Sequence, residues 1–170
     1  TSFGIVDLIA HSMEAYFGRG EASLSDKFVY AIIHEAIEFG PALMKDLTNY
    51  ELRANIMWAA TNALNGITGH GRVTGDWGVH SLGHILSFLY DTPHGATLSI
   101  VYPAWLKQMK ERIPERIEEF GKAVEKDLAN YLQISDVAAL NTGTSALHLA
   151  LILLNIKKDD EVLVSTFTFS

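Results

Sequence analysis

Five residues in the first part of the chain could together bind a metal ion. They are Asp7, His11, His80, His84 and His94, of which the first two and the next two are spaced four apart. Side chains four residues apart project from one face of a helix, so each pair can point into one site. Three of these imidazoles and the carboxylate would form a mixed nitrogen and oxygen set that suits Fe(II), Zn(II) or a similar divalent ion. Ca(II) and Mg(II) prefer oxygen, and a coordination position left to a substrate would make the site catalytic.

Helices must position these residues, because apolar side chains recur at helical spacing through most of the chain. The pattern predicts helices over residues 3–17, 26–39, 49–64, 77–90, 94–109 and 115–132. Gly40 and Pro41 are predicted to end the second helix, and the glycine-rich stretch 66–75 is predicted to be a loop. After Gln133 the pattern changes to a short apolar run, a helix over 145–155 and a strand over 161–166. The predicted fold class is mainly α with a small C-terminal β-α-β appendage.

Composition excludes several classes of protein. The formal net charge of −7 would mostly repel a phosphate backbone, so nucleic acid is not an expected partner. The longest apolar run, residues 146–154, is too short for a membrane span, so no membrane partner is expected. The absence of cysteine removes disulfides, thiolate metal sites and cysteine nucleophiles, and fits a reducing compartment.

Four stretches carry a family resemblance: DLIAHSMEAYF, NYELRANIMWAATNALNG, GDWGVHSLGH and YDTPHGATLSIVYPAWL. With the metal pattern, they resemble the C-terminal domain of the iron-dependent (group III) alcohol dehydrogenases over roughly residues 4–124. The resemblance implies an all-helical, dehydroquinate-synthase-like fold. It also implies that Asp7, His11, His80 and His94 are the metal ligands. His84 would face the nicotinamide and substrate, where an imidazole can transfer or position a proton.

The reaction implied by this resemblance is oxidation of an alcohol to an aldehyde with hydride transfer to NAD(P). A divalent ion lowers the pKa of an alcohol and, in reverse, polarises a carbonyl. In this cytoplasmic family an N-terminal Rossmann-like domain binds NAD(P), and the stretch GITGHGRVTG lacks the spacing and preceding strand of a dinucleotide fingerprint. The chain is therefore expected to bind a divalent metal but not to turn over alcohol by itself.

The remainder of the chain resembles a different enzyme. From about residue 125, the sequence EKDLANYLQISDVAALNTGTSALHLALILLNIKKDDEVLVSTFTFS resembles the start of the large domain of DegT/StrS-type aminotransferases, which use pyridoxal phosphate. This resemblance implies that Gly143, Thr144 and Ser145 form a turn that binds the cofactor phosphate at a helix N-terminus. The catalytic lysine and aspartate of that family would lie beyond Ser170, so pyridoxal phosphate is not expected as a working cofactor.

The two resemblances meet inside one predicted amphipathic helix, near residues 122–126, without a linker. Natural fusions normally join whole domains through linkers, so the sequence predicts an engineered, recombinant chimera of segments 1–124 and 125–170. Unpaired edges of the C-terminal strands could pair two copies into a homodimer. Two further interpretations stay open: a designed structural protein with an empty metal site and no catalytic function, and a pyridoxal-phosphate module.

Overall fold

The computed structural model describes residues 1–132, apart from the side chains of residues 126, 131 and 132. This part of the chain is mainly helical, as the sequence predicts. Its elements are α1 (Ser2–Tyr16), α2 (Ser23–Lys45), α3 (Tyr50–Leu64), the 3₁₀ helix η1 (Ile67–Gly69), α4 (Gly78–Tyr90), α5 (His94–Met109) and α6 (Pro114–Leu132). The predicted β-α-β appendage, the turn at 143–145 and the strand edges lie outside the described residues.

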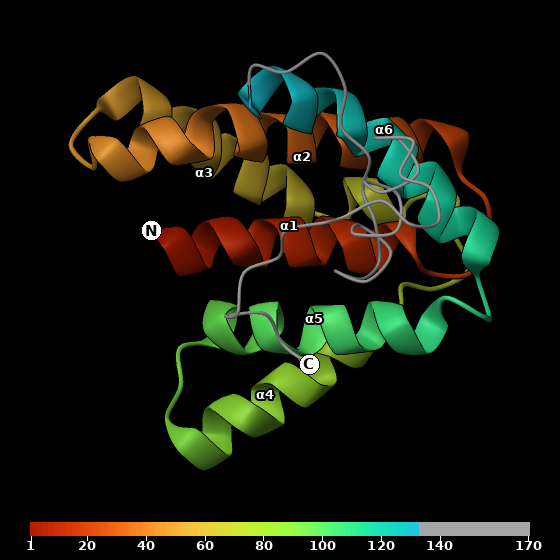
Figure 1. Cartoon of the computed structure of the whole chain (residues 1–170). Helices are drawn as coiled ribbons and strands as arrows, with labels where there is room; N and C mark the ends of the chain where they lie inside the picture. The colour runs from red at the N-terminus through yellow and green to blue at the C-terminus, as the bar shows by residue number, and fades with distance from the viewer. Residues whose placement is uncertain (133–170) are drawn as a thin grey trace, which may run out of the picture. The chain divides into compact units, whose positions relative to one another are not determined.

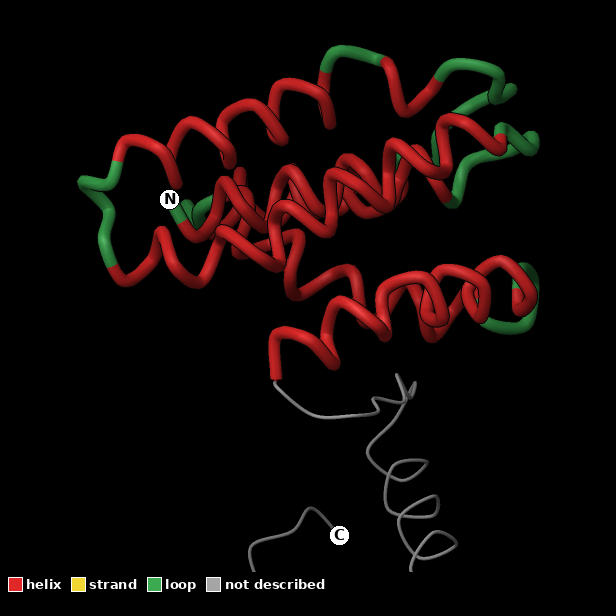
Figure 2. Tube along the Cα trace, turned by 90° about the horizontal axis from the view of Figure 1, so that it is seen from above, coloured by secondary structure: helices red, strands yellow, loops and turns green. Residues whose placement is uncertain are grey.

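Helix α1 runs through the middle of the described part. It lies between α2 and α3 on one side and α5 on the other, and α4 packs against α5 (Figure 1). Helix α6 packs against α2. Seen from above, the described residues form helices joined by loops and turns, without a strand among them (Figure 2). No described helix is both long and apolar enough to cross a membrane.

Three apolar clusters hold the helices together, and α1 contributes to each. The first joins α1, α2 and α3 through Leu8, Ile32, Ala36, Leu43, Ile56, Ala59 and Ala63. The second joins α1, α4 and α5 through Ala10, Val79, Leu98, Val101 and Tyr102. The third joins α1, α2 and α6 through Tyr16, Phe17, Val29, Ile33 and Val124. Because α1 is buried on opposite faces, its polar residues Ser12 and Glu14 have no contact with bulk water.

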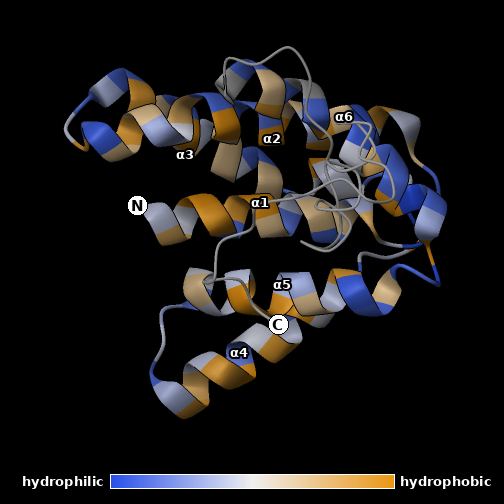
Figure 3. Ribbon diagram, in the orientation of Figure 1, coloured by the Kyte–Doolittle hydropathy of each residue, from blue (hydrophilic) through white to orange (hydrophobic). Residues whose placement is uncertain are grey.

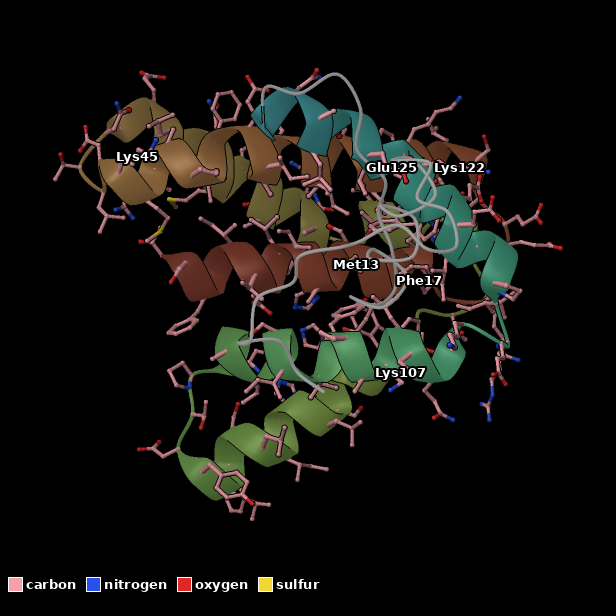
Figure 4. The ribbon with its side chains drawn as sticks, in the orientation of Figure 1. Met13, Phe17, Lys45, Lys107, Lys122 and Glu125 are labelled. Atoms are coloured by element: carbon pink, nitrogen blue, oxygen red, sulfur yellow. The ribbon has the colours of Figure 1, made fainter. Side chains whose placement is uncertain are left out.

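Side-chain polarity follows this arrangement. Hydrophobic residues concentrate along α1 and the inner faces of its neighbours, while α6 shows many hydrophilic residues (Figure 3). Met13 on α1 and Phe17, which directly follows α1, lie on the side that faces α5, where both pack into the apolar clusters (Figure 4). Lys45, Lys107 and Lys122 are exposed. Lys122 therefore marks a solvated side of α6, whereas the apolar residues of this helix pack into the third cluster with α1 and α2.

The helix boundaries agree with the sequence except in α2. Asn49, where the third helix is predicted to begin, caps α3 by accepting a hydrogen bond from the Leu52 amide at 3.1 Å. The prediction that Gly40 and Pro41 end the second helix is wrong, because α2 continues through both residues to Lys45. Gly40 is buried where Ile5 of α1 crosses it, and Leu43 beyond the proline is buried in the first cluster. Burial of this last turn outweighs the hydrogen bond that proline removes.

A histidine at the contact between α2 and α6 makes this contact sensitive to pH. His34 Nδ1 lies 2.8 Å from Asp127 Oδ1 on α6, and its Nε2 lies 3.1 Å from Glu38 Oε2. The hydrogen bond with Asp127, aided by the charges of Asp127, Glu38 and Glu35, raises the pKa of His34. A raised folded-state pKa adds stability that is complete below the unfolded pKa and is lost as the pH rises through the folded value.

We therefore expect His34→Ala to cost more stability at mildly acidic pH than at alkaline pH. The difference should be at most about 0.5 kcal/mol, because the His34 side chain is 46% exposed. Urea unfolding of the wild type and the variant at several pH values measures it. An equal cost at every pH would contradict the assignment.

Candidate metal centre

Three helices bring the candidate ligands together. Asp7 and His11 lie one turn apart on α1, His80 lies in the first turn of α4, and His94 is the first residue of α5. The start of α5 can approach α1 because the next residue is Gly95, where a Cβ atom would lie only 2.2 Å from the Phe3 carbonyl oxygen. This close approach holds the end of α5 that carries His94 beside the start of α1.

Ligand atoms of Asp7, His80 and His94 all lie within 4.8 Å of one another. Asp7 Oδ1 is 3.3 Å from His80 Nε2 and 3.7 Å from His94 Nε2. His11 Nε2 is also 3.7 Å from Asp7 Oδ1, but it falls outside the mutual group of three. Its ring packs against His80 with the centroids 4.2 Å apart. The structure thus gathers three predicted ligands closely and places the fourth, His11, at their edge.

His84 takes a different position from the four candidate ligands. It is exposed, and its ring stacks on His94 with the centroids 4.4 Å apart and the planes at 25°. The centroid distance to His80 is 5.9 Å. His84 is not part of the group of three, and its imidazole is open to solvent beside the candidate centre.

Glu14, which the sequence pattern did not single out, lies directly behind His80. Glu14 is completely buried, and its Oε2 contacts His80 Nδ1. Its Oε1 accepts hydrogen bonds from the backbone amides of Val79 at 2.9 Å and His80 at 3.0 Å. Glu14 follows His11 by three residues and Asp7 by seven, so helical spacing put all three on one face of α1. That spacing was the available signal.

Burial and neighbouring charges act differently on the histidines. Burial, followed by the nearby His80 imidazole, lowers the pKa of His11. Burial, followed by the His84 imidazole, lowers the pKa of His94. Metal ligation requires neutral imidazoles, so these shifts favour the form of both side chains that can bind an ion.

His80 shows the opposite shift. Burial by itself lowers its pKa, but the hydrogen bond and charge of Glu14, together with Asp7, raise it overall. A cation at the centre would replace the proton on Nε2, which faces Asp7. The donor set fits a divalent ion of borderline character: imidazole nitrogens from two helices and one carboxylate oxygen from a third.

The fold of residues 1–132 and the site they contain define a mainly helical protein with a candidate divalent-metal centre. Residues 1–160 match the model of the Fe-containing alcohol dehydrogenase family, C-terminal. The chain therefore belongs to the Fe-containing alcohol dehydrogenase family and matches the C-terminal part of its members. The match extends past residue 124, where the sequence analysis placed the junction. The resemblance of the later residues to aminotransferases stays a prediction.

Two relatives and one crystal structure show how much of such proteins the chain matches. The chain is 38% identical over 122 residues to the NADPH-dependent aldehyde reductase YqhD of Escherichia coli, covering 71% of this chain and 31% of the relative. It is 42% identical over 108 residues to the probable NADH-dependent butanol dehydrogenase 2 of Bacillus subtilis, covering 63% of this chain and 27% of the relative. The crystal structure of NADH-dependent butanol dehydrogenase A from Thermotoga maritima matches with a TM-score of 0.71 at 40% identity, covering 73% of this chain and 31% of that protein's chain. The chain thus spans about three tenths of these proteins.

Proposed function

We propose that this chain supplies the divalent-metal site of an NAD(P)-dependent enzyme that interconverts alcohols and aldehydes. The observation that carries the proposal is the convergence of Asp7, His80 and His94 from three helices on one point. Family membership supports it, since the relatives include an aldehyde reductase and butanol dehydrogenases. Short-chain alcohols and aldehydes are accordingly the proposed substrates of the whole enzyme.

The residues divide into two roles in this proposal. Asp7, His80 and His94 would hold Fe(II), Zn(II) or a similar ion, with His11 as the fourth ligand. When bound, the ion supplies a Lewis acid that favours ionisation of an alcohol or polarises a carbonyl. Asp7 offsets one of the two metal charges, which leaves net positive charge for the substrate oxygen.

His84 has the second role, which is to move or position a proton. Its ring is exposed yet fixed by stacking on His94. An exposed imidazole next to the site can carry a proton between the substrate and solvent. Because His84 is outside the ligand group, its removal should leave metal binding intact.

Metal binding by three variants of the full chain tests this division. Equilibrium dialysis against Zn(II), and against Fe(II) without oxygen, should give one ion per wild-type chain. We expect His94→Ala to weaken binding by more than about 100-fold, since a ligand is lost. His84→Ala and the control His70→Ala, which changes an exposed histidine, should bind within about threefold of wild type.

Two results would contradict the proposal. Absence of metal binding by the wild-type chain at any loading would favour the alternative interpretation of a structural protein with an empty site. An equal loss of affinity in His84→Ala and His94→Ala would contradict the separation of roles.

A further inference from the structure

Glu14 joins the candidate centre to the start of α4 through one buried carboxylate. Its side chain is completely buried in α1. The residue before α4, Trp77, provides no side-chain hydrogen bond to the free amides of the helix. Glu14 Oε1 instead accepts from two of them, those of Val79 and His80. A carboxylate suits this position because the N-terminus of a helix carries partial positive charge.

The other oxygen of the same carboxylate determines which nitrogen of His80 carries hydrogen. Both ring nitrogens of His80 face a carboxylate oxygen, which only accepts hydrogen bonds: Nδ1 contacts Glu14 Oε2, and Nε2 lies farther away, at 3.3 Å, from Asp7 Oδ1. A neutral imidazole carries one hydrogen, and the closer and completely buried carboxylate of Glu14 takes it at Nδ1. Nε2, which faces the centre, then keeps its lone pair.

We propose that Glu14 is a positioning residue that holds His80 in the tautomer with Nδ1 protonated and Nε2 free to bind the metal. The inference rests on the proposed metal site. Glu14 acts through His80, since Oε1 and Oε2 are both engaged by the start of α4. Outer partners of this kind typically contribute a factor of about 10–100 to metal affinity.

Glu14→Gln tests the proposal with almost no change of shape. Two backbone amides donate at the Oε1 position, so the glutamine amide must place its oxygen there. Its NH₂ group then faces His80 Nδ1 and donates to it, which forces the hydrogen of His80 onto Nε2. The amides at the start of α4 keep their hydrogen-bond acceptor, but the Nε2 of His80, which faces the metal, now carries a hydrogen and has no lone pair for the ion.

We expect Glu14→Gln to weaken binding of Zn(II) to the full chain by about 10–100-fold. The matched control Glu111→Gln, at an exposed position, should bind like wild type. In the metal-free protein, ¹⁵N NMR at a pH above the His80 pKa should show hydrogen on Nδ1 in wild type and on Nε2 in Glu14→Gln. Circular dichroism reports whether the variant keeps its helices.

The NMR measurement separates the inference from the proposed function. A wild-type chain that binds no metal but shows the predicted tautomers would support the role of Glu14 and contradict the metal site. Hydrogen on Nε2 of wild-type His80 would overturn the inference, whether or not the variant folds. Unchanged affinity in a folded Glu14→Gln variant would overturn it as well.

Discussion

Replacing Asp26 with alanine is expected to lower the free energy of unfolding by about 3–5 kcal/mol. Asp26 Oδ1 accepts hydrogen bonds from Arg72 Nη2 and, at 2.6 Å, from Arg116 Nη2. The Arg72 side chain is only 1% exposed, so its charge has almost no contact with water. Without Asp26, a buried guanidinium would lose its charged partner, and such unpaired charges are the costly case. Urea or guanidinium unfolding at neutral pH measures the loss.

Arg116 provides a matched control, because it has a second carboxylate partner. Its Nη1 lies 3.0 Å from Glu119 Oε2, but the Glu119 side chain is 60% exposed. Glu119→Gln should therefore cost less than about 1 kcal/mol. Equal costs for Asp26→Ala and Glu119→Gln would show that burial of the Arg72 and Asp26 pair does not matter, contrary to this account.

The same cluster sets how the chain responds to acid. Burial by itself raises the pKa of Asp26, but the hydrogen bonds and charges of Arg116 and Arg72 lower it overall. A depressed folded-state pKa contributes stability that is present above the unfolded pKa and is lost as the pH falls through the folded value. The difference in free energy of unfolding between wild type and Asp26→Ala should consequently shrink only below about pH 4, which is the ordinary pKa range of an aspartate.

Asp7→Asn is expected to weaken divalent metal binding by more than about 100-fold. Asp7 Oδ1 lies within 3.3 to 3.7 Å of nitrogens of His80, His11 and His94, so it is the shared partner of the three imidazoles. Asparagine preserves the size of the side chain but removes its negative charge, which leaves a doubly charged ion without compensation. Isothermal titration with Zn(II) measures the change.

Thermal or urea unfolding provides a second readout for Asp7. Metal at about 100 times the wild-type dissociation constant should stabilise wild type by about 2.7 kcal/mol, and the same metal concentration should stabilise Asp7→Asn by less than about 0.4 kcal/mol. The control is Asp91→Asn, an exposed aspartate with a φ of 50° that asparagine also tolerates. A metal increment in Asp7→Asn equal to that of the control would contradict the role of Asp7.

The sequence predicted the helices well because each has its own apolar period and its own boundary residues, such as Asn49 before α3. It failed at Gly40 and Pro41, since the cost of a proline inside a helix is local whereas the burial of Leu43 depends on α1 and α3. The local sequence pattern gives the helix propensity of a segment. Packing between segments distant in the sequence decides whether a helix continues through residues of low propensity such as Gly40 and Pro41.

The candidate ligands were accessible from spacing and resemblance, but the groups that support them were not. Glu14 acts on His80, which is 66 residues later in the chain, and no local pattern reports that contact. Arg72, Asp26 and Arg116 come from three separate segments and meet only after α2, α6 and the loop before α4 have packed. Buried polar partners of this kind become visible when the fold brings their segments together.

Anomalous diffraction from a crystal of the Zn(II)-loaded chain tests the central claim most directly. We predict a single strong peak within bonding distance of Asp7, His80 and His94, with His11 completing the site, and no peak there in crystals of His94→Ala. A strong peak within bonding distance of other residues, with none between Asp7 and the two histidines, would contradict the proposed metal site.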